Sequence, residues 1–264
     1  MDWLEWVFSP EFRRYIFDHN LFFFPLLFLL RIVGMTAVEL LYPARKVSYR
    51  SVLLPDFAAF FAYQYVVMPW AGQIDHMIND HVIVLKPHLP DALLGMPLYA
   101  RVICYLVIGD LGQYWIHRFL HAKYIWRIHK WHHSPTYMYW LAGVRATVPQ
   151  QVLVNIPHIM AFTFLGLSPW WMALAIALLH IFQNDWMHLN VSWRLKWMEW
   201  LLVTPRYHHV HHSSNPEHYL ANLGILFTVW DRLFGTYVNP DEVKEPLSFG
   251  IGEKVPLVRL ALGV

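Results

Sequence analysis

Five long apolar stretches dominate the hydrophobic pattern of the chain. They cover residues 21–41, 52–68, 98–116, 147–165 and 170–187. Crossing the hydrocarbon core of a membrane takes about 20 mainly apolar residues, so each stretch is long enough for a spanning helix or nearly so. The sequence Gly-Leu-Ser-Pro at 166–169 forms a turn between the last two stretches and predicts a helical hairpin there. The pattern predicts an all-α, polytopic membrane bundle of five spans, or four if half of the hairpin is re-entrant.

Polar residues gather in the segments between and around these stretches. Residues 1–20 mix charged and aromatic side chains and predict a short interfacial helix. Residues 70–97 contain prolines and aspartates, so we expect an extramembrane loop with a short amphipathic helix. Residues 193–203 are rich in tryptophan and predict another interfacial helix. We expect residues 204–264 to be mainly cytoplasmic, within one integral membrane domain that covers 1–264.

Composition favours a membrane protein and removes several other classes. Hydrophobic residues make up 57% of the chain and charged residues 14%, whereas about 25% of an ordinary soluble domain is charged. The net charge of +2 with neutral histidine is too balanced to indicate a nucleic-acid partner. The single cysteine, Cys104, excludes an internal disulfide and a thiolate metal site as main features.

Histidines are the chemically distinctive residues, and eight of the 17 form three clusters. One HxxxH spacing and two HxxHH spacings place them at His117, His121, His129, His132, His133, His208, His211 and His212. Residues three and four apart share one face of a helix, so we expect each cluster to aim its imidazoles at one point. Eight imidazoles exceed the four ligands of a tetrahedral zinc ion, which suggests two metal ions.

Another histidine, His188, lies at the base of the hairpin, where it could close the site from a different helix. We exclude His209, because including it would break the HxxHH spacing. We expect packing or hydrogen-bonding roles for His158 and His180, and a loop position for His218.

Ligating imidazoles usually donate their second N–H to a carboxylate or a carbonyl. Asp110 is seven residues before His117 and Tyr114 is three before it, so both share its helix face and are candidates for this supporting role. Asp185 and Asp231 are further candidates, although a helix cap or an ion pair with the next residue would explain Asp231 equally well.

The basic segments predict on which side of the membrane these clusters lie. Residues 42–50 and 118–145 carry basic residues and no acidic ones. Residues 1–20 hold two basic against four acidic residues, and residues 70–97 hold one against three. Because basic loops favour the cytoplasm, we expect the histidines in a cytoplasm-facing helical cap. The membrane would be a bacterial inner membrane or the endoplasmic reticulum.

Nitrogen ligands alone fit iron, zinc or copper. The apolar walls formed by spans rich in tryptophan, phenylalanine and leucine can admit an acyl chain or a sterol from the bilayer. Such substrates offer mainly unactivated C–H bonds, and breaking them calls for oxygen activated by a redox metal.

The histidine clusters and their flanking residues resemble a known family. The matching sequences are DLGQYWIHRFLH, HKWHHS, HLN, TPRYHHVHHS and NLGILFTVWDRLFGTY. They are similar to the fatty acid hydroxylase/sterol desaturase superfamily of integral membrane non-haem di-iron oxygenases. The resemblance covers roughly residues 39–237, as judged from the spacing of these motifs. One departure is Leu223, where many members have tyrosine.

The resemblance implies that the eight clustered histidines, with His188, bind two iron ions. It further implies hydroxylation of an unactivated C–H of a lipid, with O2 as co-substrate. Electrons would come from a separate donor, a ferredoxin or a b-type cytochrome with its reductase. Lipid desaturation at the same site is the alternative, because the motifs do not distinguish the two outcomes.

Two other classes compete with this interpretation. A zinc-dependent membrane hydrolase would use zinc-bound hydroxide and a general base such as glutamate, and the chain has no HExxH motif. A metal transporter would place its ligands near mid-membrane along a path, whereas these histidines gather at one predicted face.

Overall fold

The computed structural model describes residues 20–84, 95–167 and 170–264, and the regular secondary structure of these parts is helical. Its α-helices are α3 (Asn20–Leu41), α4 (Tyr49–Ala62), α5 (Met68–Ile83), α7 (Leu98–Leu120), α8 (Trp126–His129), α9 (Val148–Phe164), α10 (Trp170–His188), α11 (Pro205–His211), α12 (Val229–Leu233) and α13 (Leu257–Leu262). A π-helical turn, η1 (Tyr63–Val67), joins α4 to α5, and 3-10 turns occur at η3 (Trp140–Val144), η4 (Met198–Trp200) and η5 (Pro216–His218). Within the described ranges there are three isolated β-bridges and no strand. The prediction of an all-α fold is confirmed.

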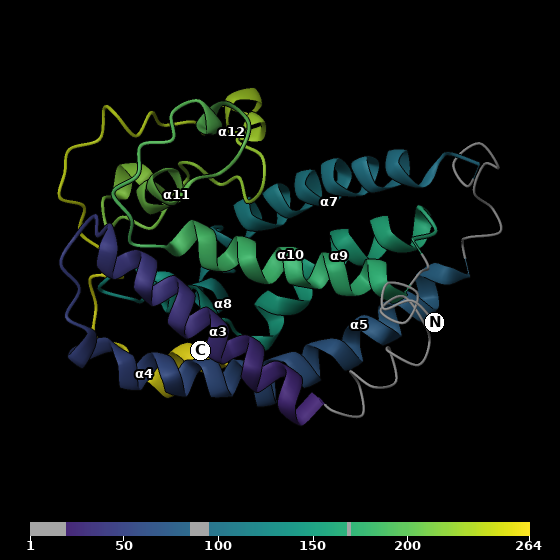
Figure 1. Cartoon of the computed structure of the whole chain (residues 1–264), viewed down its shortest axis with the longest axis horizontal. Helices are drawn as coiled ribbons and strands as arrows, with labels where there is room; N and C mark the ends of the chain where they lie inside the picture. The colour runs from purple at the N-terminus through teal and green to yellow at the C-terminus, as the bar shows by residue number, and fades with distance from the viewer. Residues whose placement is uncertain (1–19, 85–94, 168–169) are drawn as a thin grey trace.

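The long helices form a bundle with a small cap at one end (Figure 1). In that view α3, α4 and α5 lie on one side, α7 lies on the other, and α9 and α10 lie between them. Helix α9 packs against both α5 and α7. The short helices α11 and α12 gather at the end where α7 and α10 finish. Residues distant in sequence therefore meet at this end of the bundle.

Helices α7 and α9 approach closely because glycines face α9. A Cβ atom on Gly112 would lie 2.6 Å from the Cβ of Pro157, and one on Gly109 would lie 2.6 Å from Nδ1 of His158. The other ring nitrogen of His158 is 2.9 Å from the side-chain oxygen of Gln113, and its ring centroid is 4.3 Å from that of His180. These two histidines pack between helices, as the sequence predicts.

Residues 70–97 are expected to form a loop with a short amphipathic helix, but the helical part is longer than expected, because α5 runs from Met68 to Ile83. Its polar side chains are paired with α9 instead of being solvated. Asn155 donates to Asp75 over 2.6 Å, and Thr163 donates to Asn79 over 2.6 Å. With these partners the helix can include residues whose polarity suggests a loop.

The helix expected over residues 193–203 is also wrong. Only η4, Met198–Trp200, has helical geometry there, and the segment is held by long-range contacts. The backbone N–H of Ser192 donates to the carbonyl of Tyr42, and the indole of Trp186 donates to the carbonyl of Val203. These contacts accompany a chain of turns and one 3-10 turn in place of the expected helix.

One continuous helical stretch in the described part of the chain, Tyr49–Ile83, is long and apolar enough to be a candidate membrane span. The count of four to five spans, the cytoplasmic orientation and the single domain over residues 1–264 stay predictions. The interfacial helix expected at 1–20 falls almost entirely outside the described residues, as does His88.

Candidate metal centre

The end of the bundle beside the cap brings all nine predicted histidines together. Helix α7 supplies His117 and, just after its end, His121, while α10 supplies His188. Helix α8 and the turn that follows it supply the first HxxHH, and α11 with its C-cap supplies the second. Eight of the nine are buried, and His121 is partly exposed. The helices thus gather these imidazoles in the interior of the protein.

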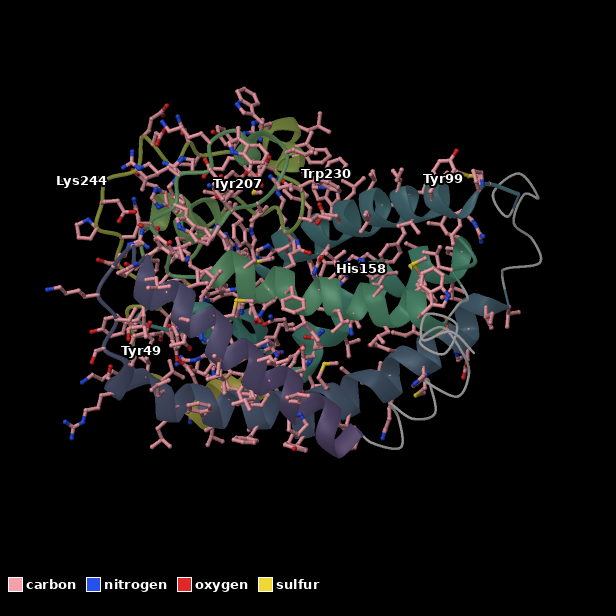
Figure 2. The ribbon with its side chains drawn as sticks, in the orientation of Figure 1. Tyr49, Tyr99, His158, Tyr207, Trp230 and Lys244 are labelled. Carbon is pink, nitrogen blue, oxygen red and sulfur yellow. The ribbon has the colours of Figure 1, made fainter. Side chains whose placement is uncertain are left out.

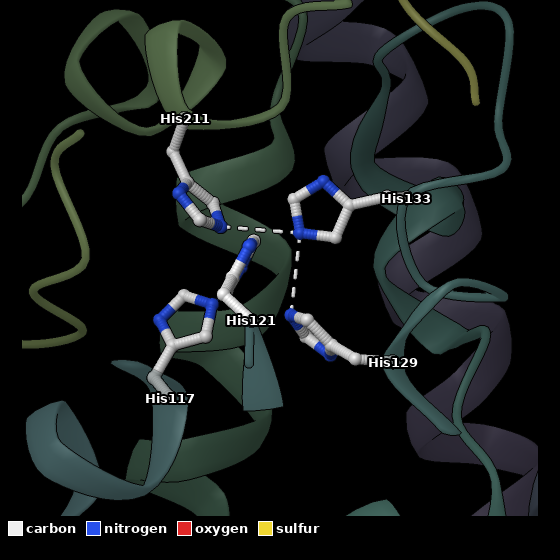
Figure 3. Close-up of side chains that lie close together, drawn as sticks. All are labelled: His117, His121, His129, His133 and His211. Carbon is white, nitrogen blue, oxygen red and sulfur yellow. Dashed lines mark hydrogen bonds between the residues drawn. The ribbon is translucent and has the colours of Figure 1, made fainter. Parts of the chain in front are cut away.

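The nine imidazoles form two groups, and in each group one ring nitrogen per residue lies within 4.8 Å of all the others. The first group contains His117, His121, His129, His133 and His211, and it is drawn in Figure 3. The second group contains His132, His188, His208 and His212. The rings of His133 and His212 stack with their centroids 4.3 Å apart, so the groups are neighbours. The expectation of two adjacent metal sites fits this arrangement.

Each HxxHH sequence divides between the two groups instead of aiming at one point, which corrects our expectation. In the first copy, His129 and His133 belong to the first group and His132 to the second. In the second copy, His208 and His212 belong to the second group and His211 to the first. In each copy the residues four apart stay together, while the histidine between them belongs to the other group.

Backbone carbonyls fix the orientation of four of these rings. Three Nδ1 atoms bond to carbonyls of other segments, in the pairs His117–Leu223 (2.8 Å), His132–Arg145 (3.2 Å) and His211–Ala221 (2.9 Å), and Nδ1 of His188 bonds to the carbonyl of Asn184 one turn earlier in α10 (2.7 Å). A carbonyl accepts only, so each Nδ1 carries the proton and each Nε2 presents its lone pair. Carbonyls can support metal-binding histidines in this way.

The donor set fits a metal ion in each group. Nε2 of His211 lies 3.1 Å from Nε2 of His133, and Nε2 of His188 lies 3.2 Å from Nε2 of His212, so lone pairs converge at short range. Five further buried ring nitrogens have no hydrogen-bond partner in the part of the chain that the structure describes: Nε2 of His121, Nδ1 of His129, both nitrogens of His208 and Nδ1 of His212. Burying unpartnered polar atoms is costly. A cation among them would remove that cost.

Burial also keeps the imidazoles in the form that binds metal. In α8, α11 and the turns after them, burial and neighbouring imidazoles hold the pKa of the histidines well below the ordinary value of 6.5. The affected residues are His129, His132, His133, His208, His211 and His212. These side chains are therefore neutral at pH 7, as ligation requires.

A buried acidic residue in α3 organises the wall of the second group. Glu39 accepts the backbone N–H of Trp140 over 2.7 Å and that of Asn190 over 2.8 Å. The first contact holds η3, and the second holds the chain immediately after His188. The carboxylate of Glu39 thus ties two segments of the site together, which the sequence does not indicate.

A second buried acid, Asp56 of α4, supports the carbonyl that receives His132. Its carboxylate forms an ion pair with Arg145 at 2.5 Å and accepts the hydroxyl of Tyr139 at 2.5 Å. Arg145 is the residue whose carbonyl bonds to His132. No sequence motif indicates that these residues contact one another, because they lie in separate elements.

Asp231 supports the first group through the backbone of residues 221–224. It accepts the N–H groups of Leu223 and Gly224, both over 2.7 Å, and the hydroxyl of Tyr207 over 2.9 Å. Burial and the nearby carboxylate raise the pKa of Tyr207, so its hydroxyl stays protonated and donates. Asn222 has φ 52°, a left-handed conformation that asparagine tolerates better than most residues. This loop carries the carbonyls that bind His117 and His211.

The other three candidates for a supporting role contact different partners. Asp110 accepts from the backbone of Leu226 and Phe227 and from the indole of Trp230. Tyr114 bonds to Thr236 and Arg118, and Asp185 is paired with Arg31 at 2.6 Å. None of the three bonds to a clustered imidazole within the described residues. They hold the cap and the helices in place instead.

Two histidines near the site stay outside both groups. His209 is buried, with Nδ1 2.9 Å from the Arg45 guanidinium and Nε2 3.4 Å from the carbonyl of His188. His218 lies 2.6 Å from the hydroxyl of Ser213. The structure thus agrees with leaving them out of the predicted ligand set.

Gly143 offers a test of the packing around His188. A Cβ there would lie 2.5 Å from Nδ1 of His188 and 2.8 Å from the side-chain nitrogen of Asn184. We expect Gly143→Ala to displace the His188 ring and to lower metal content, as measured by elemental analysis of the folded protein. Gly34→Ala is the matched control, because its Cβ would meet no atom within 4 Å. Equal metal content in the two variants would contradict the assignment of His188.

A family model for fatty acid hydroxylases matches residues 102–236, about half of the chain, and this range contains all nine histidines. The chain belongs to the fatty acid hydroxylase family. The family relationship confirms the resemblance seen in the histidine motifs and their flanking sequences.

Three proteins of known function are similar in sequence to part of this chain. It is 33% identical to alkylglycerol monooxygenase of Danio rerio over 145 residues, which cover 54% of this chain and 32% of that protein. It is 29% identical to the Delta(7)-sterol 5(6)-desaturase of Gibberella zeae, over 57% of this chain and 45% of the relative. Methylsterol monooxygenase 1-1 of Arabidopsis thaliana is 24% identical over 84% of this chain and 78% of its own length.

The chain thus spans less than half the length of the first two of these relatives. No solved structure shows significant similarity to the chain.

Proposed function

We propose that this fatty acid hydroxylase family member is an O2-dependent membrane oxidoreductase that hydroxylates an unactivated C–H bond of a lipid. The observation that carries the proposal is the pair of adjacent, buried, all-histidine groups. Its relatives support the reaction class, because their names describe monooxygenases and a desaturase that act on alkylglycerols and sterols.

The residues proposed to hold the metals are the nine histidines of the two groups. Five nitrogen donors in one group and four in the other leave each metal without carboxylate ligands. Such donors fit iron, copper and zinc, and we favour iron because oxygen-dependent attack on C–H bonds needs a redox metal. Two bound irons would supply the chemistry that activates dioxygen.

The protein's own contribution is to orient the ligands and to keep water away. Four backbone carbonyls fix the orientation of histidine rings. Asp56 and Asp231 hold the segments that carry three of those carbonyls, and Glu39 holds the chain just after His188. Burial of the histidines excludes bulk solvent, which protects a reactive site from side reactions.

We further propose that the substrate reaches the site from the bilayer and that the histidine clusters face the cytoplasm. Electrons would then come from a separate cytoplasmic donor, such as a ferredoxin or a b-type cytochrome with its reductase. The basic segments 42–50 and 118–145 support this orientation.

Metal analysis combined with oxygen uptake tests the proposed function. Protein purified without oxygen should contain two irons per chain and should consume O2 when given a reductant and membrane lipid. A zinc-loaded preparation with full hydrolytic activity and no oxygen uptake would overturn the proposal in favour of a hydrolase.

Lipid desaturation is the second candidate, and the similarity to a sterol desaturase favours keeping it. Mass spectrometry of the product separates the two, because hydroxylation adds an oxygen atom whereas desaturation removes two hydrogen atoms. Labelled O2 should appear in a hydroxylated product and be absent from a desaturated one.

A further inference from the structure

A patch of exposed large apolar side chains lies on the cap, away from the metal ligands. Its members and their exposed fractions are Trp197 (74%), Trp200 (74%), Leu201 (56%), Val229 (39%) and Leu233 (66%). We call it the α12 patch. Side chains of this size are seldom left together in water without a partner.

Direct contacts join the two segments that carry the α12 patch. Leu202 and Phe227 form an antiparallel bridge, and the N–H of Thr228 donates to the carbonyl of Leu201 over 3.0 Å. The guanidinium of Arg232 lies 5.0 Å from the ring centroid of Trp200. Residues 197–201 and 229–233 therefore form one surface.

The patch lies beside the middle of helix α7. Asp110 accepts two backbone N–H groups of the loop before α12 and the indole N–H of Trp230 over 2.8 Å. Asp110 is seven residues before His117, which is about 10 Å along the helix. Figure 2 shows Trp230 next to α7, whereas Lys244 lies at the far end of the cap.

The patch is continuous with the exposed apolar face of α7. The ring of Phe234, at the end of α12, lies 4.8 Å from that of Trp115. Trp115 is 47% exposed, and Ile108 on the same helix is 53% exposed. If α7 crosses the membrane, the lipid that covers Ile108 and Trp115 extends over the α12 patch.

Charge around the patch fits lipid headgroups. Arg194 is exposed, and Arg232 covers Trp200 while donating to the carbonyl of Glu199. The two acidic residues within these segments, Glu199 and Asp231, are buried and bonded inward. Tryptophan and leucine flanked by arginine are typical of the boundary between headgroups and acyl chains, where the arginine reaches phosphate.

We propose that the α12 patch is a lipid-contact surface that seats the cap in the headgroup–acyl boundary of an anionic phospholipid bilayer. The proposal extends the proposed function by adding a second membrane contact, made by the cap instead of the helical bundle. It rests on the proposed membrane arrangement, and its test requires no turnover.

Site-directed spin labelling in vesicles tests this surface. The single cysteine is first replaced, as Cys104→Ser, and nitroxide is attached to Trp200→Cys or Leu233→Cys. Leu54→Cys, 80% exposed on the candidate span, is the lipid-facing control, and Lys244→Cys is the aqueous control. Leu201→Cys replaces Trp200→Cys if that variant fails to fold. The vesicles contain phosphatidylcholine and phosphatidylglycerol.

Collision with O2, which concentrates in lipid, is compared with collision with a water-soluble nickel chelate. We expect labels in the α12 patch, like the label at position 54, to collide several-fold more with O2 than with the nickel chelate. The label at position 244 should collide more with the nickel chelate than with O2. A label in the patch that is as accessible to nickel as Lys244 overturns the proposal. Protection from both reagents also overturns it, because the patch would then be covered by protein, either a second copy or a partner.

The two proposals fail separately. If oxygen uptake is absent but the labels are accessible to lipid, the enzyme assignment fails and the lipid contact stands. If oxygen uptake occurs but the labels are not accessible to lipid, the lipid contact fails and the enzyme assignment stands.

Discussion

Replacing His132 with alanine is expected to lower the bound metal from two ions per chain to one and to reduce turnover by at least about 100-fold. His132 is one of four members of the second group, and its ring is fixed by the carbonyl of Arg145. Substitutions that only support a ligand already cost about 10- to 100-fold in affinity or activity, so loss of a ligand should cost no less. Metal stoichiometry and oxygen uptake measure the two effects.

His209→Asn is the matched control for this experiment. His209 is as buried as the proposed ligands and lies in the same helix as His208 and His211, but it belongs to neither group. We expect this variant to keep both metals in whatever fraction of the protein folds. Full metal content in His132→Ala, or equal metal loss in the two variants, would refute the division into two groups.

Asp231→Asn is expected to destabilise the cap by about 3 kcal/mol and to weaken metal binding about 10- to 100-fold. The Asp231 carboxylate accepts four hydrogen bonds, from Leu223, Gly224, Tyr207 and Thr236. An amide nitrogen cannot accept, so at least one buried donor loses its partner. The loop that presents carbonyls to His117 and His211 should then shift. Thermal unfolding in detergent and titration with iron measure the two losses.

Asp241→Asn controls for loss of a carboxylate alone. Asp241 is exposed and pairs with Lys196 and Arg206 at the surface, so its removal should leave metal affinity unchanged. If Asp231→Asn binds iron as the unaltered protein does, the loop at 221–224 does not orient the ligands.

Hydrophobic periodicity predicts the fold well wherever a helix is uniformly apolar. The spans expected near residues 21–41, 98–116, 147–165 and 170–187 correspond to α3, α7, α9 and α10. The prediction fails at α5, because Asp75 and Asn79 look like loop residues until their partners on α9 are known. It fails again at 193–203, where long-range hydrogen bonds override the local pattern.

The histidines of the site could be found from spacing, because imidazoles four apart point in one direction. The groups that orient these histidines could not be found from spacing. Three of the four carbonyl acceptors belong to Leu223, Ala221 and Arg145, and nothing in the identity of these residues indicates that role. Helix spacing can place a carboxylate beside a ring, whereas Asp231 acts through the backbone of a loop and Glu39 through two backbone N–H groups.

The division of each HxxHH between the two groups means that the centre is not modular. Neither copy of the motif builds one site that could be gained, lost or transplanted by itself. Exchanging either copy for another sequence would take ligands from both groups, since each contributes to both. The two proposed metal positions therefore share one set of helices, and a version of this fold with a single site would have to keep both motifs and change individual histidines within them.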